Sequence, residues 1–305
     1  MEKKVVFKKP KWLRRFASAL LDFIAFVILS LLISLAVEPL SFAMLNGNEA
    51  KKTYYDYAVS THLYEYDDQG NITKLYNLNT YDDNLYYFYD NCLHKNDEYD
   101  NIKKEKPEMF HYDETKNRYV ENAFDMGDIN EKSKYIVFYN EQREYLINNY
   151  LDDYLNQFDE YRKAKKIFSL ANYLTTLLSA LFGLSIVFIL IPLTNKNYKT
   201  IGKMAFKLKV ISISNIETRP TKIQILFRQL ITVFFEYILS ISTIGIFGIP
   251  IPIVFIASII LVLLTKYNQS FHDLCSQTII IDDYPDLGPI DQKDKYEITY
   301  KNVKE

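Results

Sequence analysis

The sequence is poor in the residue types that build disulfide frameworks and phosphate-binding loops. Its 305 residues include only two cysteines, eight glycines and four scattered histidines. Two cysteines are too few for a disulfide framework or a cysteine-rich metal site. No spacing typical of a catalytic triad, a zinc site or a P-loop is present. We therefore expect no enzymatic activity, no metal and no cofactor.

Charged residues are nearly absent from long stretches of the chain. Apolar residues concentrate in 16–45, 167–193 and 223–265, whereas 46–166 is polar and acidic. A hydrophobic content of 49% and a net charge of −2 would suit a soluble protein, but this segregation predicts membrane spans with a soluble insert.

The apolar stretches predict four transmembrane helices, because a hydrocarbon core needs about 20 helical residues. Phe16–Val37 and Ile167–Leu193 each supply one span. The stretch 223–265 is long enough for two, about 223–243 and 249–265, which the glycines and proline of 245–250 separate. The expected fold is an all-α four-helix transmembrane bundle with an inserted α+β extracytoplasmic domain.

We expect the first helix to be retained rather than removed as a signal peptide. Its apolar run is too long for a signal sequence, and no small residues suited to cleavage follow it.

Basic residues predict the orientation of the spans. Residues 1–15 and 194–222 each carry seven lysines and arginines, which places both segments in the cytoplasm. Four basic residues at 162–166 favour the opposite side, but charges on a long loop weigh less. The prediction is a multi-pass protein of the cell membrane with cytoplasmic termini. Its parts are 1–45 (N-terminus and first span), 46–166 (outer domain), 167–283 (three spans with the basic loop 194–222) and 284–305 (tail).

The outer domain is expected to be acidic, rich in tyrosine and partly β. Residues 46–161 hold 25 acidic and 12 basic side chains and 19 of the 26 tyrosines. Alternating residues around turn sequences predict two hairpins, 62–76 and 109–120, and Lys134–Tyr139 reads as a further strand.

A helical stripe follows these strands. Ile147, Leu151, Tyr154, Phe158 and Tyr161 recur at spacings of four and three. The stripe predicts one continuous helix that leads into the second span. It can serve as a mechanical stalk or simply pack on the outer domain.

Charged residues within the predicted spans are costly in lipid and so are candidate functional residues. Asp22 lies in the first span, seven residues after Arg15, and Arg228 and Glu236 lie in the third. Cross-helix pairing is expected, for example of Asp22 with Arg228 and of Arg15 with Asp273. Such pairs can fix helix register, or Asp22 and Glu236 can change protonation along a cation or proton path.

Four segments, in this order, resemble the RDD family of membrane proteins, which is named for one arginine and two aspartates. They are Arg15–Asp22 (RFASALLD), Thr200–Val210 (TIGKMAFKLKV), Arg228, and Phe271–Ile280 (FHDLCSQTII). Gly202 and Lys203 belong to the cytoplasmic motif, and Asp273 stands at the second aspartate.

The resemblance implies possible transport, since cation/proton antiport is reported for some members of the family. The expected partners are the lipid bilayer and a second copy or another membrane protein, with no nucleic acid. The alternative is a non-transporting scaffold or sensor whose outer domain binds a partner.

Overall fold

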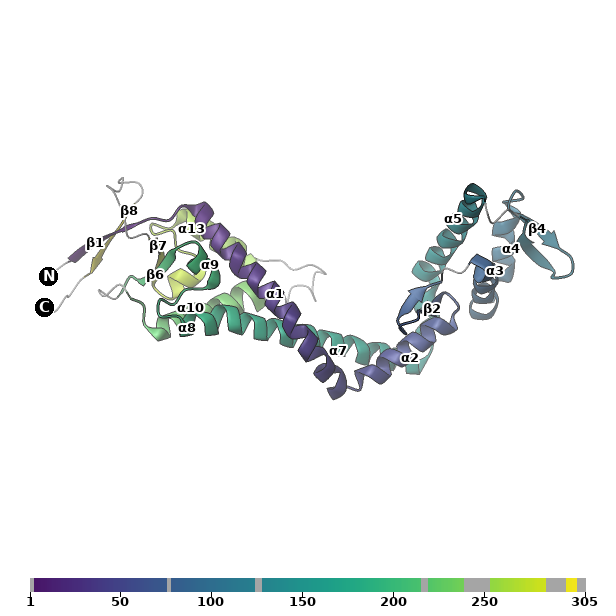
Figure 1. Cartoon of the computed structure of the whole chain (residues 1–305), viewed down its shortest axis with the longest axis horizontal. Helices are drawn as coiled ribbons and strands as arrows, with labels where there is room; N and C mark the ends of the chain where they lie inside the picture. Colours follow the sequence, from purple (N-terminus) through teal and green to yellow (C-terminus); the bar gives the residue numbers. More distant parts are fainter. Residues whose placement is uncertain are drawn as a thin grey trace. The chain divides into compact units, whose positions relative to one another are not determined.

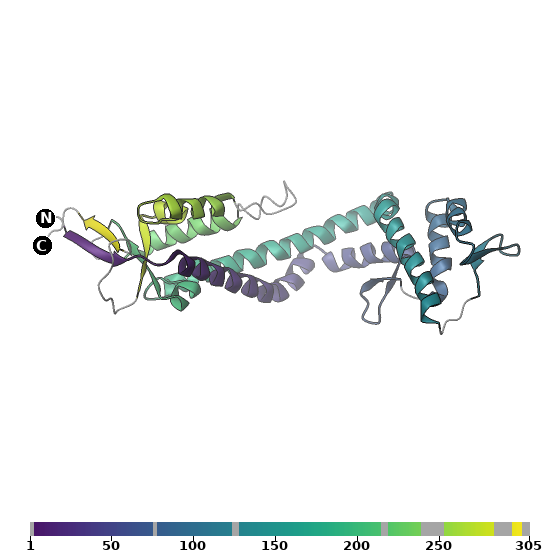
Figure 2. The ribbon, with the colours of Figure 1, turned by 90° about the horizontal axis from the view of Figure 1, so that it is seen from above.

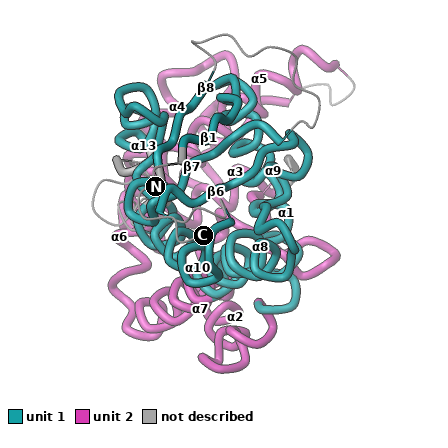
Figure 3. The backbone as a smooth tube through the Cα atoms, turned by 90° about the vertical axis from the view of Figure 1, so that its left-hand side faces the viewer, with its two compact units in different colours: residues 1–37, 175–305 teal, residues 38–174 magenta. Residues whose placement is uncertain are grey.

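The computed structural model describes residues 3–75, 78–123, 128–214, 219–238, 253–283 and 295–300. It divides into two compact units, coloured separately in Figure 3. Unit 1 comprises residues 1–37 and 175–305, and unit 2 comprises residues 38–174.

Two helices in the described part of the chain are long and apolar enough to cross a membrane. The first is α1 (Trp12–Met44), and the second is the helical run Asp159–Thr194. This run consists of α7 (Asp159–Leu184), the π-helix η3 (Ser185–Leu190) and α8 (Ile191–Thr194).

The predicted third and fourth helices are partly described. Unit 1 also contains α10 (Lys222–Ile231), the π-helix η4 (Thr232–Ile238) and α13 (Ile253–Leu264). The predicted reversal at 245–250 lies outside the described residues.

Unit 1 also contains strands, and those in the described residues lie outside the four predicted spans. The strands β6 (Leu208–Ser212) and β7 (Thr278–Asp282) pair antiparallel, as do β1 (Lys3–Lys8) and β8 (Lys295–Tyr300), which lie side by side in Figures 1 and 2. Isoleucines of β6 and β7 pack with Tyr296 and Ile298 of β8. Short buried strands of this kind show no alternation of polar and apolar residues, and therefore neither β6 nor β7 was predicted as a strand.

The segments before β6 and β7 are two copies of one local structure, 70 residues apart. A short helix precedes each strand, α9 (Ile201–Ala205) before β6 and α14 (Phe271–Cys275) before β7. The backbone is left-handed at matching positions before and after these helices, Tyr198 and Asn268, then Lys207 and Gln277.

The strand register makes the two copies related by a local two-fold. Val210 pairs with Ile280, and these residues are themselves 70 positions apart. When equivalent residues of two copies face each other in an antiparallel pair, a two-fold axis between them maps each strand onto the other.

The helices that precede the two copies follow the same relation. Arg14 of α1 donates to the carbonyl of Phe206 and, at 2.7 Å, to Asp282. Gln224 of α10 donates to the carbonyl of Ser276 at 3.5 Å and to the hydroxyl of Ser212 at 3.2 Å. Ser276 is 70 positions after Phe206, and Ser212 is 70 positions before Asp282. Thus α1 and α10 hold equivalent places in a duplicated unit.

Unit 2 is a mixed helical and β structure, as expected for the insert. Its strands are β2 (Tyr64–Tyr66) with β3 (Ile72–Lys74), and β4 (Phe110–Asp113) with β5 (Arg118–Glu121). Both predicted hairpins are confirmed. Its helices are α2 (Gly47–Ser60), α3 (Leu78–Tyr87), η1 (Phe88–Cys92), α4 (Asn96–Lys104), α5 (Ile129–Leu146), η2 (Ile147–Leu151) and α6 (Asp152–Leu155).

The predicted strand at Lys134–Tyr139 was wrong, because this segment lies inside α5. Its aromatic residues raise β-propensity, yet Tyr135, Tyr139 and Leu146 are buried at helical spacings of four and seven. Burial of one helical face outweighs local strand preference here.

The continuous helix predicted from the stripe was also wrong. The helix α6 ends at Leu155, and α7 begins at Asp159. Leu151, Tyr154 and Tyr161 all contact the core of unit 2, so the stripe packs on this unit.

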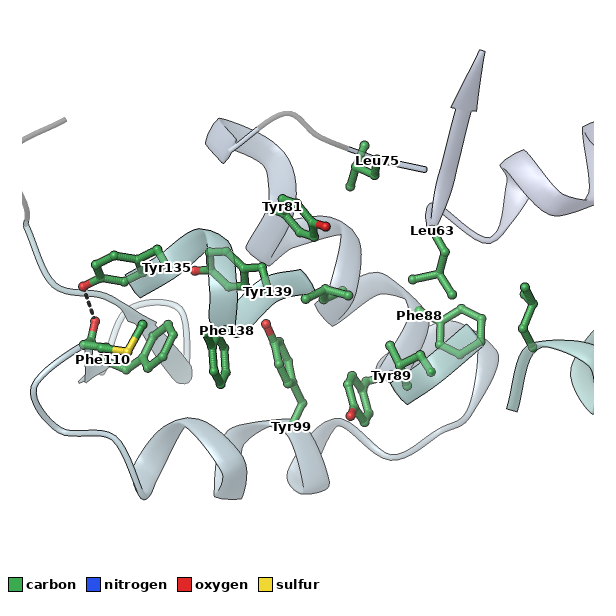
Figure 4. Close-up of a cluster of buried hydrophobic side chains, with 14 of the residues drawn as sticks. Leu63, Leu75, Tyr81, Phe88, Tyr89, Tyr99, Phe110, Tyr135, Phe138 and Tyr139 are labelled. Carbon is green, nitrogen blue, oxygen red and sulfur yellow. Dashed lines mark hydrogen bonds between the residues drawn. The ribbon is translucent and has the colours of Figure 1, made fainter. Parts of the chain in front are cut away.

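Stacked tyrosines form much of that core (Figure 4). The rings of Tyr89 and Tyr99 are 4.8 Å apart and nearly parallel, and those of Tyr81 and Tyr139 are 5.2 Å apart. Buried tyrosines need partners for their hydroxyls, and Tyr135 donates to the carbonyl of Met109 at 2.7 Å. The abundance of tyrosine is thus accounted for largely by packing.

A buried lysine crosses this aromatic core. The Lys103 side chain is fully buried, 2.6 Å from Asp82 and 2.8 Å from the carbonyl of Tyr119. Its ammonium also lies 4.3 Å from the ring centroid of Tyr99. Burial lowers the pKa of Lys103, and the Asp82 carboxylate opposes that effect.

We predict that Asp82→Asn destabilises unit 2 by about 3 kcal/mol, because it leaves a buried ammonium without its counter-charge. Hydrogen exchange of the α4 amides in the full-length protein, followed by mass spectrometry, measures this loss. Adding Lys103→Met to Asp82→Asn should recover part of the protection. Equal protection in the wild type and Asp82→Asn would contradict the role of the pair.

Candidate functional site

The first aspartate of the site joins α1 to the short helix α9. Asp22 lies in α1 and is 2% exposed. Its two oxygens accept hydrogen bonds from the amide of Gly202 at 2.7 Å and the hydroxyl of Thr200 at 2.6 Å. Lys203 lies 3.9 Å away and supplies a positive charge. Asp22 therefore anchors the first turn of α9, whose own N-cap is Thr200.

Gly202 makes this contact possible because it has no side chain. A Cβ placed there would lie 1.9 Å from the carbonyl oxygen of Ser18 in α1. The close approach of the two backbones brings the Gly202 amide within reach of Asp22.

The second aspartate joins three helices of unit 1. Asp273 in α14 is completely buried. It accepts from Arg228 of α10 at 2.9 Å and from Arg15 of α1 at 3.3 Å. The hydroxyls of Ser270 and Thr278 donate to it at 2.7 and 3.2 Å.

These charges keep Asp273 ionised. Burial alone would raise the pKa of its carboxyl, but the guanidinium groups around it, Arg228 first and also Arg15, hold that pKa well below its usual range. A carboxylate with this many donors is suited to holding helices together.

The pairing expected between Asp22 and Arg228 was wrong. The equivalence of α1 and α10 explains the difference, because Asp22 faces the short helix of one copy and Arg228 faces the short helix of the other. Asp22 thus meets α9, and Arg228 meets Asp273 of α14. Arg15 lies against Asp273, the acid suggested for it. The side chain of Glu236 lies outside the described part of the chain.

Three further residues of the site escaped sequence reasoning, namely Thr200, Ser270 and Thr278. Ser270 forms a capping box with Asp273 at the start of α14. Thr200 stands three positions before Lys203, and Ser270 stands three positions before Asp273. A hydroxyl residue at this spacing is typical of a helix start and could have located both residues.

A cavity of about 400 Å³ adjoins both aspartate sites. Its charged lining consists of Arg15, Asp22, Lys203 and Arg228, and the rest includes apolar residues such as Ile259. Lys203 belongs to the segment between the predicted second and third spans. Burial, and then the nearby Arg228, lower the pKa of Lys203 to about 8, although Asp22 raises it. Lys203 can therefore exchange its proton near physiological pH.

We predict that Gly202→Ala lowers the thermal stability of the full-length protein in detergent by roughly 5 °C or more. The added methyl collides with the α1 backbone and removes the hydrogen bond to Asp22. A thermal unfolding curve monitored by light scattering measures the effect.

Met204→Ala is the matched control, since Met204 lies two residues further along α9 and is 41% exposed. It should unfold within about 1 °C of the wild type. Equal shifts for both variants would show that the contact between Gly202 and Ser18 carries no special weight.

Comparison with known protein families gives one match. Residues 153–277 match the sequence model of the RDD family. This range includes Gly202, Lys203, Arg228 and Asp273, whereas α1 with Arg15 and Asp22 precedes it. Comparisons with curated proteins and with solved structures gave no match. The family match and the two apolar helices indicate a membrane protein, and the match over residues 153–277 supports an RDD family protein.

Proposed function

We propose that this protein is a multi-pass membrane protein that exchanges protons for a small cation. The observation that carries the proposal is the Asp22–Lys203 pair at the wall of the cavity. It combines a buried carboxylate with a lysine whose pKa is about 8.

The proposed topology has four spans and cytoplasmic termini. The basic segments 1–15 and 194–222 support this orientation, because lysine and arginine favour the cytoplasmic side. Residues 46–166 then form the extracytoplasmic domain.

The proposed exchange uses the charge balance around Asp22. While Lys203 is protonated, its ammonium compensates the Asp22 carboxylate at 3.9 Å. When Lys203 loses its proton, a monovalent cation in the cavity can take over that compensation. Cation entry and proton release are thereby coupled, with the proton leaving from Nζ of Lys203.

Asp273 has a different role in this proposal. Two arginines and two hydroxyl groups satisfy it, so it holds the helices while Asp22 and Lys203 exchange charge. Because four spans are few for a complete carrier, we expect a homo-oligomer or a partner membrane protein.

We predict that Asp22→Asn abolishes cation-driven proton flux in liposomes that contain the purified protein. Asparagine can still accept the Gly202 hydrogen bond, so the variant removes charge while conserving shape. Proton flux under sodium and potassium gradients is read with a pH-sensitive dye inside the liposomes. An Asp22→Asn protein that inserts correctly and keeps the wild-type flux would contradict a role for Asp22.

The pH dependence gives a second test of the same pair. Wild-type flux should change most steeply near pH 8, where the Lys203 proton is half dissociated. Lys203→Met should flatten this profile between about pH 7 and 9, because the titrating group is gone. A profile with the same midpoint in Lys203→Met would assign the titration to another group.

A non-transporting scaffold or sensor is the second candidate function. It is favoured by the complete hydrogen bonding of Asp22 and Asp273 and by the separate core of unit 2. Absence of flux under all three gradients, sodium, potassium and proton, would support this function over transport.

A further inference from the structure

A second hollow in unit 1, of about 500 Å³, lies at the start of α1. Five of its eleven lining residues are basic, namely Lys8, Lys9, Lys11, Arg14 and Arg15. Its one acidic residue, Asp282, is bound by Arg14 at 2.7 Å. The hollow is therefore strongly positive.

The lysines of this basic hollow are available to bind an anionic ligand. Among the described residues, Lys8, Lys9 and Lys11 form no ion pair within 4.0 Å. Lys9 lies 6.0 Å from the ring centroid of Tyr296, a contact that leaves its ammonium uncompensated by a carboxylate. An anion in the hollow would meet several lysines at once.

The basic hollow borders an apolar surface. It shares Trp12, Val262 and Leu263 with the cavity beside Asp22. Trp12 is 68% exposed and Leu263 is 69% exposed. Tryptophan at the end of a membrane helix marks the interface between headgroups and acyl chains, so this apolar surface faces the acyl chains next to the headgroup level.

We propose that the basic hollow binds the headgroup of an anionic phospholipid, with an acyl chain lying along Trp12, Val262 and Leu263. The lysines recognise the phosphate charge, and the adjoining apolar side chains recognise the chain. Basic pockets at helix ends on the inner membrane face have the required chemistry. A free phosphate would use the lysines alone, and a zwitterionic lipid would lack the net charge. The site depends on the membrane location of unit 1 and is independent of ion exchange.

Trp12 allows a direct test, because it is the single tryptophan of the chain and lines the site. The full-length protein is reconstituted in phosphatidylcholine vesicles with a fixed fraction of phosphatidylglycerol. The bromine label is carried either by the phosphatidylglycerol or by an equal amount of the phosphatidylcholine, with the lipid composition unchanged. We expect brominated phosphatidylglycerol to quench Trp12 several-fold more strongly than brominated phosphatidylcholine.

Lys8→Gln/Lys11→Gln removes two charges from the hollow and conserves the contact of Lys9 with Tyr296. The preference for phosphatidylglycerol should fall by about a factor of five for each charge removed, until it reaches parity. The matched control is Lys196→Gln/Lys222→Gln, which removes two exposed lysines outside the hollow and should retain the wild-type preference.

Three results would overturn the proposal. Equal quenching by the two brominated lipids in the wild type would exclude selective binding of the anionic lipid. Equal losses in both double variants would show general attraction to a charged surface. Loss of the preference on adding inorganic phosphate at fixed ionic strength would assign the hollow to free anions. None of these readings involves proton flux, so failure here and failure of the ion exchange are separable.

Discussion

The buried carboxylate of Asp273 is the interaction on which the arrangement of unit 1 depends. It draws together α1, α10 and α14 through Arg15 and Arg228. Removing one member of such a buried pair lowers the free energy of unfolding by about 3–5 kcal/mol, because the remaining buried charge is neither paired nor solvated by water. The strands β6 and β7 then extend from the two short helices as a paired ribbon. In the equivalent place of the other copy, Lys203 stands where Asp273 stands, and Asp22 of α1 provides the carboxylate. The duplicated unit thus uses opposite charges at matching positions.

This inversion explains why one half is suited to structure and the other to exchange. Asp273 is held by guanidinium groups, which stay protonated at all relevant pH values. Asp22 is compensated by an ammonium whose pKa is about 8, and that charge can be lost. The cavity of about 400 Å³ adjoins both halves, and Asp22 and Lys203 belong to its lining. The proposed ion exchange at Asp22 and the proposed lipid binding at the basic hollow use adjoining parts of unit 1, since both cavities share Arg15 and Trp12.

The features that the sequence predicted have strong local patterns. The long apolar run around Asp22 and the turn residues between β2 and β3 each act over a few neighbouring positions. The helix α5 was mistaken for a strand at Lys134–Tyr139 because aromatic content was weighed above helical spacing. The strands β6 and β7 were missed because both are buried and lack alternation. Of the five charged candidates, the structure places Arg15, Asp22, Arg228 and Asp273 at the site, whereas the side chain of Glu236 lies outside the described residues. The partner of Asp22 was not predicted. That partner depends on the close approach of Gly202 to Ser18, which is a tertiary contact. Segments 198–212 and 268–282 share only Ile211 and Ile281 at matching positions, so the duplication becomes visible in the strand register rather than in the sequence.

The most direct test of this account is a double-mutant cycle between Arg228 and Asp273. Thermal unfolding of the full-length protein in detergent is measured for Arg228→Met, Asp273→Asn and the double variant. We predict that Asp273→Asn is the more damaging single change, because it leaves both Arg15 and Arg228 without their carboxylate. We also predict that the double variant loses less than the sum of the single losses, with a coupling of at least about 1 kcal/mol. Strictly additive losses would contradict the claim that Asp273 and Arg228 hold unit 1 together.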